Sequence, residues 1–125
     1  MAERFVLARL RIKPAFGFIH EGYTVSLEQN RSDYYLAVVE CDGQTNKKSR
    51  RRVALSEIEV QEQLASLKQA TVPAFPVSPE VCDGSYIELT VKGEFSTLTL
   101  GWWTIAPQGA ERFSEFADWM REHPG

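Results

Sequence analysis

The stretch Cys82–Trp119, CDGSYIELTVKGEFSTLTLGWWTIAPQGAERFSEFADW, decides the fold, because it carries the signals of two paired strands followed by a helix. After a turn at Asp83-Gly84, Tyr86–Lys92 alternates apolar and polar residues, which is the pattern of a half-buried strand. The turn residues Lys92-Gly93-Glu94 predict a reversal into a second strand over Phe95–Trp103. The two segments are therefore expected to pair as an antiparallel hairpin.

A helix is expected after this hairpin. Pro107 is placed to open it, since proline suits the first helical position, and the apolar pattern ends near Glu122. Spacings of i, i+3, i+4 and i+7 place one set of apolar side chains on a single helix face: Phe113, Phe116, Ala117 and Met120. That face is expected to pack on the sheet.

Four earlier segments have the composition of further strands: Phe5–Lys13, Tyr23–Glu28, Tyr34–Cys41 and Lys48–Ala54. In the first segment, alternation places one apolar set on one face and the arginines on the other: Val6, Ala8, Leu10 and Ile12. The third segment is apolar on both faces, which is typical of a strand inside a sheet. A loop, Pro14–Gly22, is expected between the first two strands.

Another helix is expected after the fourth strand. Ser56 and Glu59 have the spacing of a capping box, in which each side chain accepts a hydrogen bond from a free backbone N–H. Val60, Leu64 and Leu67 form the apolar stripe of this helix, while Glu59 lies on the face toward water. The element order is then β-β-β-β-α-β-β-α. We predict a single α+β domain over residues 1–125, with a mostly antiparallel sheet and both helices packed on one face.

The charge balance and the lack of long apolar runs limit the function classes. The chain has 14 Lys and Arg residues against 17 Asp and Glu, a net charge of −3, which argues against a general nucleic-acid binder. Met1–Arg11 lacks the pattern of a signal peptide, and no stretch approaches the roughly 20 apolar residues of a membrane span. We therefore expect a cytoplasmic protein without membrane contact, in which Cys41 and Cys82 are reduced thiols.

The densest positive cluster runs into the fourth strand. It comprises Lys47, Lys48, Arg50, Arg51 and Arg52. One interpretation is contact with phosphates or another anionic partner. The other, which we favour, is a solvated strand edge whose charges discourage pairing with a second sheet. No aromatic residue is interleaved with the run, so the sequence gives base stacking no support there.

The last helix carries an acidic stripe opposite its apolar face. The members fall at i, i+4, i+7 and i+11: Glu111, Glu115, Asp118 and Glu122. Like charges at i, i+4 cost about 0.2–0.5 kcal/mol per pair, so a helix selected for stability alone would interleave lysines. The stripe is either a surface for a basic partner or an ordinary face toward water, and we favour the second interpretation.

Two tryptophans are candidate anchors for a protein partner, because tryptophan is enriched at binding hot spots. Trp119 borders the acidic stripe. Trp102 and Trp103 are neighbours in one strand and must point to opposite faces, so only one of them is expected in the core. Partial burial against neighbouring side chains is the alternative for Trp103 and Trp119 alike.

Signals for catalysis are few. His20 and Glu21 are adjacent in a loop, but adjacency alone establishes no acid–base geometry. We predict no catalytic residue, no metal site and no cofactor. The remaining possibility for a small molecule is a pocket lined by aromatic and polar side chains of the first loop: Phe16, Phe18, His20 and Tyr23.

Part of the final third forms a recurring arrangement: Cys82-Asp83-Gly84-Ser85-Tyr86-Ile87-Glu88-Leu89, then Gly93, Trp102-Trp103 and Pro107. This order of Asp-Gly strand, hairpin, tryptophan-bearing strand and proline-led helix resembles small uncharacterised bacterial α+β domains, some of which are immunity proteins of toxin systems. The resemblance implies a cytoplasmic protein that binds and blocks a cognate toxin and needs no active site. The acidic stripe would then suit a basic nuclease.

Three function hypotheses follow. The first is a non-enzymatic protein-binding module of immunity type, which neutralises a toxin. The second is a small-molecule-binding domain or small enzyme with a pocket near Phe16–Tyr23. The third is nucleic-acid binding through Lys47–Arg52. Neither the oligomeric state nor the identity of the partner follows from the sequence.

Overall fold

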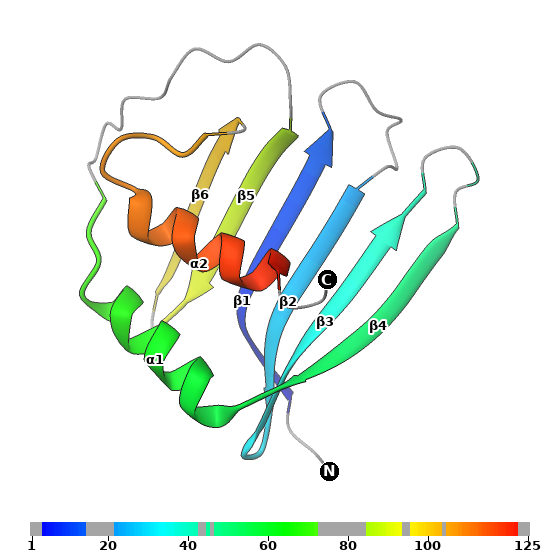
Figure 1. Ribbon diagram of the computed structural model, residues 1–125, viewed down its shortest axis with the longest axis horizontal. Helices are drawn as coiled ribbons and strands as arrows, with labels where there is room; N and C mark the ends of the chain where they lie inside the picture. The colour runs from blue at the N-terminus through cyan, green and yellow to red at the C-terminus, as the bar shows by residue number, and fades with distance from the viewer. Residues whose placement is uncertain are drawn as a thin grey trace.

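The computed structural model describes residues 4–14, 22–42, 45, 47–72, 85–93, 96–103 and 105–122. These residues form a six-stranded sheet and two helices (Figure 1). The strands are β1 (Arg4–Pro14), β2 (Gly22–Asn30), β3 (Asp33–Cys41), β4 (Lys48–Leu55), β5 (Ser85–Lys92) and β6 (Thr97–Trp103). The helices are α1 (Glu57–Lys68) and α2 (Glu111–Glu122).

The sheet has the order β4-β3-β2-β1-β5-β6, and every neighbouring pair is antiparallel. The expected α+β class and the element order β-β-β-β-α-β-β-α are confirmed. The first four strands follow one another across the sheet, and the β5–β6 hairpin pairs with the free edge of β1. Strand β1 therefore lies inside the sheet, flanked by β2 and β5.

Both helices cover the same face of the sheet, as expected (Figure 1). The core lies between them and the strands. From α2 it takes the four apolar residues that the spacing predicted: Phe113, Phe116, Ala117 and Met120. Fully buried residues of the sheet include Leu10, Leu27, Leu36 and Leu89. The hydrophobic effect thus favours one buried face of the sheet and leaves the other without a helix among the described residues.

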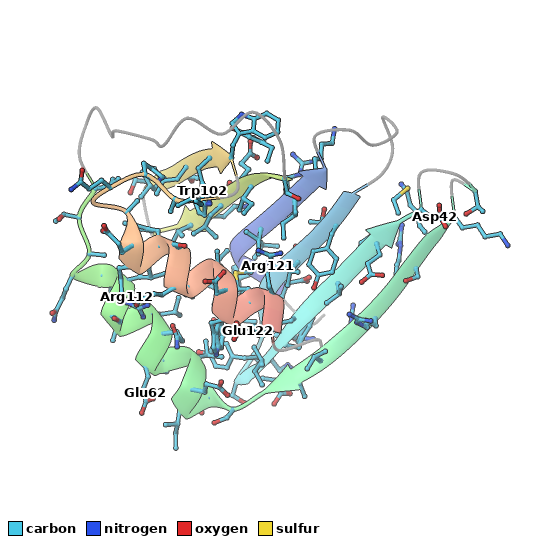
Figure 2. All side chains as sticks on the ribbon, turned by 45° about the horizontal axis from the view of Figure 1, so that its top comes forward. Asp42, Glu62, Trp102, Arg112, Arg121 and Glu122 are labelled. Atoms are coloured by element: carbon cyan, nitrogen blue, oxygen red, sulfur yellow. The ribbon has the colours of Figure 1, made fainter. Side chains whose placement is uncertain are left out.

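Side-chain hydrogen bonds join the two helices. Ser56 caps α1, and its Oγ accepts from the backbone N–H of Glu59 at 3.5 Å. The carboxylate of Glu59 was expected toward water, but it is only partly exposed and accepts from Trp119 Nε1 at 2.8 Å. Arg112 of α2, labelled in Figure 2, donates to Gln63 at 3.1 Å and also to Ser66, both on α1. These contacts fix the helices against each other.

One face assignment in β1 was wrong. The register shifts between Val6 and Ala8, so Leu7 is an extra residue opposite β2. Val6 therefore lies opposite Glu28, on the face away from the helices, while Leu7 packs against the core. Ala8 and Leu10 are buried as expected. A β-bulge reverses the alternation at one point, which the period of two alone does not reveal.

The start of α2 also differs from the expectation. The helix begins at Glu111 and not at Pro107, which lies in a turn closed by a hydrogen bond from Ala110 N–H to Pro107 O at 3.1 Å. Gly109 in this turn has φ 93°, a conformation that a right-handed helix does not contain. In the β5–β6 hairpin, Gly93 N–H donates to Ser96 O at 2.8 Å, so β6 starts at Thr97.

Several expected features lie outside the described residues. These are the turn at Asp83-Gly84, the second cysteine Cys82 and most of the first loop, including Phe16, Phe18 and His20. The ends of that loop are described. Pro14 is the last residue of β1 and Gly22 is the first of β2, so both strands extend further than the alternation indicated.

The adjacent tryptophans provide a matched test of the fold. Trp102 is 4% exposed and Trp103 is 44% exposed. We expect Trp102→Ala to lower the free energy of unfolding by about 3–5 kcal/mol, because it empties a core site. Trp103→Ala should cost only about 1 kcal/mol, since it removes one aromatic contact at the surface. Urea unfolding of both variants measures the difference, and equal losses would contradict the orientation of β6.

Candidate functional site: the open face of the sheet

The candidate site is the sheet face that lies away from α1 and α2. Residues opposite each other in an antiparallel ladder point to the same side, so the register identifies this face. One row runs from Arg11 through Thr24 and Val39 to Arg50. The next row runs in parallel and consists of Arg9, Ser26, Ala37 and Arg52. Each row has a cation on β1, a cation on β4 and small side chains between them.

Two basic ridges result. Strand β1 contributes Arg9, Arg11 and Lys13, and β4 contributes Lys48, Arg50 and Arg52, all exposed. We call the whole sheet face that carries these six residues the basic face. The two ridges are three strand spacings apart, which is about 14 Å at about 4.8 Å per spacing. A partner that spans the ridges would contact cations on both sides.

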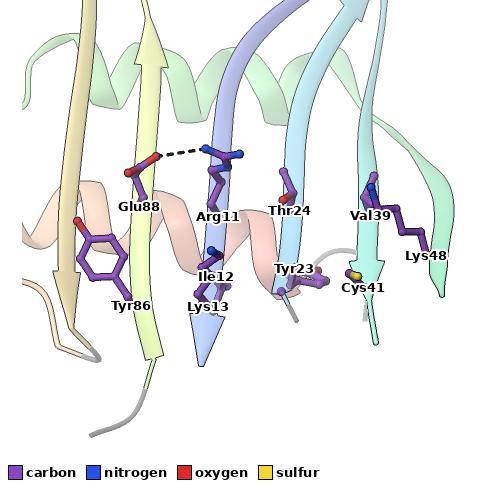
Figure 3. A pocket seen from close by; sticks show the side chains of 11 residues that line it. Arg11, Ile12, Lys13, Tyr23, Thr24, Val39, Cys41, Lys48, Tyr86 and Glu88 are labelled. Carbon is purple, nitrogen blue, oxygen red and sulfur yellow. Dashed lines mark ion pairs between the residues drawn. The ribbon is translucent and has the colours of Figure 1, made fainter. Parts of the chain in front are cut away.

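Among the described strand residues, three acidic side chains lie on this face: Glu28, Glu88 and, beside the β2–β3 turn, the exposed Asp33. Glu88 of β5 is 3.9 Å from Arg11 in an ion pair, drawn in Figure 3. Glu28 of β2 is buried and accepts from the hydroxyl of Tyr35 at 3.5 Å. The exposed carboxylates of the helices lie on the opposite side of the molecule: Glu57, Glu62, Glu111, Glu115, Asp118 and Glu122. Among the described residues, positive charge is therefore concentrated on the open sheet face and negative charge on the helix side. The net charge of −3 is an average over the two sides.

Aromatic rings accompany the basic ridges. The guanidinium of Arg52 lies 4.9 Å from the ring centroid of Tyr35, which is the geometry of a cation–π contact. Tyr86 and Trp103 form a tilted pair with ring centroids 5.1 Å apart. The Tyr86 ring also lies over Gly101, where a Cβ atom would come within 2.8 Å of its Cζ. Gly101 thus lets the ring lie against β6.

A groove of about 420 Å³ crosses the end of this face (Figure 3). Its lining comes from β5, β1, β2, β3 and β4 in turn and includes Tyr86, Lys13, Gly22, Cys41 and Lys48. Three cations line it, because Arg11 also contributes. Its volume lies in the range of small-ligand pockets, but it crosses the strands at the surface. This shape suits an elongated anionic group.

The basic run of the sequence is divided by the fold. Lys48, Arg50 and Arg52 lie on the basic face, whereas Arg51 points to the helix side and is 3.6 Å from Glu40. Lys47 precedes β4, and its carbonyl accepts from Asp42 N–H at 2.9 Å. The strand alternation explains this division. The basic run itself contains no aromatic residue, but Tyr35 of the neighbouring strand β3 lies beside Arg52.

The acidic stripe lies on the outer side of α2, with every member exposed. Glu115 is compensated by Arg112 at 3.1 Å. The carboxylate of Glu111 accepts from Gly109 N–H at 3.1 Å, and the backbone N–H groups of Glu111 and Gly109 lower the pKa of Glu111. Glu111 therefore has a local role at the start of the helix. Glu115 has a local role as the ion-pair partner of Arg112.

Trp119 and Trp103 occupy different settings. Trp119 is half-buried, its ring centroid is 5.6 Å from that of Phe116, and its N–H is bound to Glu59. Trp103 is on the basic face and more exposed. Trp103 thus has more surface to offer to a partner than Trp119. Of the expected small-molecule pocket, only Tyr23 is described; it borders the groove, but the register places it in the helix-side row with Ile12 and Glu40.

Sequence reasoning overlooked part of the basic face. Arg9 and Arg11 were recognised only as the polar side of a strand, and Lys13, Tyr35 and Tyr86 were not singled out. The alternation of β1 and β4 was a usable signal, because it places cations at every second position. The alternation does not give the strand order, and it is the strand order that brings the cations of β1 and β4 to one face.

A scan of the chain against protein-family models finds no match, and a search of curated proteins finds none either. Neither helix of the described part is long and apolar enough to cross a membrane. Within the same residues, no three His, Cys, Asp or Glu side chains gather as metal ligands would. The geometry of the basic face is therefore the main guide to function.

Tyr23 of β2 gives a pH-dependent prediction. Burial raises the pKa of Tyr23, while the charge of Arg51 opposes the rise. A raised folded-state pKa gives stability that is complete below about pH 10 and is lost as the pH rises through the folded-state pKa. We expect Tyr23→Phe to flatten this loss, and Arg51→Gln to raise the pKa of Tyr23 further. Tyrosinate absorbance and unfolding curves above pH 9.5 measure both effects; an unchanged pH dependence in Tyr23→Phe would refute the first.

Proposed function

We propose that this chain is a binding module and that the basic face receives a polyanionic partner. One observation carries the proposal: two exposed basic ridges, on β1 and β4, lie on the one sheet face that no described helix covers. The need for a hydrophobic core explains the apolar residues on the helix side of the sheet. It gives no reason for a concentration of cations on the other side.

The electrostatics favour a partner over an isolated surface. Like charges on one face repel each other, and each exposed ion pair returns at most about 1 kcal/mol. Among the described residues, the ridge cation with an ion pair is Arg11, 3.9 Å from Glu88. An anionic partner would relieve the repulsion along both ridges at once and would be steered toward them at low salt.

A polyanion fits the dimensions better than a single small anion does. The ridges are about 14 Å apart by strand spacing, so one phosphate or carboxylate cannot contact both. A chain of linked anions can do so, and the small side chains of Ser26, Ala37 and Val39 leave room between the ridges. The groove at Lys13 and Lys48 would accept one end of such a chain.

Retention on immobilised heparin tests this proposal. We expect the protein to be retained at about 50 mM salt despite its net charge of −3, and to elute as salt screens the ridges. Reversal of one cation on each ridge, Arg9→Glu with Arg50→Glu, should abolish retention.

The matched control reverses two exposed cations of the helix layer, Lys68→Glu with Arg121→Glu. It changes the net charge by the same amount and should leave retention intact. Loss of retention in the control as well would mean that only net charge matters. A wild-type protein that is not retained would refute the proposal.

A second candidate function is that of a cytoplasmic immunity protein of a bacterial toxin system. The observation that favours it is the acidic stripe on α2, whose members, among them Asp118 and Glu122, are all exposed; Figure 2 labels Glu122. A basic toxin would dock on this side, opposite the basic face. The two candidates thus predict binding on different sides of the molecule.

Charge reversal on the stripe separates the two candidates. If the immunity proposal holds, Asp118→Lys with Glu122→Lys should weaken a complex with a basic toxin at least tenfold, because it places like charges across the interface. Binding measured by calorimetry should be unchanged in Arg9→Glu with Arg50→Glu. The opposite pattern would exclude the acidic side as the docking surface.

A further inference from the structure

We infer that the polyanion received by the basic face is a single-stranded nucleic acid, whose phosphates contact the ridges while its bases stack on exposed rings. This inference rests on the proposed function of the basic face and adds the class of partner. It depends on the composition of the face, on its aromatic rings and on its width.

The composition of the face favours nucleic acid over an acidic protein. Protein–protein interfaces have an apolar centre from which charged residues are depleted. Nucleic-acid interfaces are more polar and much more positively charged. Here the cations flank the middle of the face, while the floor between them carries small side chains such as Thr24, Ser26 and Ala37. Apart from the ring of Tyr35, the described residues of β2 and β3 place no side chain larger than valine or glutamate on this floor to anchor a protein.

The aromatic rings provide surfaces for bases. Trp103 is 44% exposed and forms a tilted pair with Tyr86, next to Lys13 in the sheet register. At the other side of the face, the guanidinium of Arg52 lies over Tyr35. Bases stack on aromatic rings and on arginine planes, and such stacking tolerates any base sequence. The Tyr86–Trp103 pair lies beyond the β1 ridge, and the Arg52–Tyr35 pair lies at the β4 ridge.

The width of the sheet favours single strands over a duplex. Six strands at about 4.8 Å per spacing measure about 24 Å across, which is too broad to enter the roughly 12 Å major groove of DNA. A single strand can instead lie across the sheet, from Trp103 on β6 toward Arg50 on β4. At about 3.4 Å per stacked nucleotide, this path holds about seven nucleotides.

The overall acidic charge of the chain does not oppose this inference. Among the described residues, most exposed carboxylates belong to the two helices, away from the basic face. They are separated from the nucleic-acid path by the thickness of the sheet and helices. Solvent and salt screen charges beyond about 10 Å at moderate ionic strength.

The test is fluorescence anisotropy with four probes: a labelled 12-nucleotide oligo-U, the matching oligo-dT, a 12-base-pair duplex and a 12-residue oligo-glutamate. We expect the single strands to bind at least tenfold more tightly than the duplex or the oligo-glutamate. Binding should weaken with salt, and Arg50→Gln should reduce the magnitude of the slope of log K against log salt by about 0.7.

Stacking is tested with variants of the exposed ring. Trp103→Ala should weaken single-strand binding about fivefold or more, whereas Trp103→Phe should restore most of it. The control is Phe5→Ala, which removes another exposed aromatic side chain, 54% exposed, that lies opposite Gln29 and off the basic face. The control should bind like the wild type.

The outcomes separate this inference from the proposed function. Heparin retention with equal or tighter binding of oligo-glutamate would overturn the nucleic-acid inference and favour an acidic protein partner. Retention with duplex binding as tight as single-strand binding, or with an unaffected Trp103→Ala variant, would also overturn it while the polyanion proposal stands. If heparin does not retain the protein and no probe binds to it, both the nucleic-acid inference and the polyanion proposal are overturned.

Discussion

One-sided burial of the sheet is the constraint on which the rest of the structure depends. Two helices of 12 residues each cover a six-stranded sheet on one face, where Phe116 and Met120 pack into the core with Leu10 and Leu89. Burial of these side chains supplies the main free energy of folding. The second face receives no such cover from the described residues, so its side chains must be compatible with water or with a partner.

The polar clamp between the helices completes the covered side. Trp119 binds Glu59 through its indole N–H, and Arg112 reaches Gln63 across the helix interface. A half-buried carboxylate needs such a donor, because an unmade hydrogen bond would cost about 1–3 kcal/mol. Residues that resembled an interaction surface in the sequence therefore also hold the helix layer together. Because Trp119 has this structural role, Trp103 is the better candidate for contact with a partner.

Charge segregation is the consequence that matters for function. The antiparallel order brings the cations of β1 and β4 to the same face, with two strands between them, while the acidic residues of both helices lie on the other side. Within the described residues, a chain with a modest net charge of −3 thus presents a basic sheet face and an acidic helix side. Net charge governs solubility, whereas the local distribution determines which partners are attracted to which surface.

The sequence by itself determined the element types, their order and most of the core. Alternation and helical spacing are properties of single segments, so they located Leu10, Phe113 and Phe116 correctly. The exceptions were local deviations from periodicity, namely the bulge at Leu7 and the turn that delays α2 to Glu111.

Only the tertiary structure decided which side chains became neighbours. It placed Arg9 in one row with Arg52, put the ring of Tyr35 under that guanidinium, and joined Glu59 to Trp119 across 60 residues of sequence. The physical reason is that lateral neighbours in a sheet follow from strand pairing over long sequence separations. A segment's own pattern reports which of its sides is polar, and it carries no information about the strand that will lie beside it.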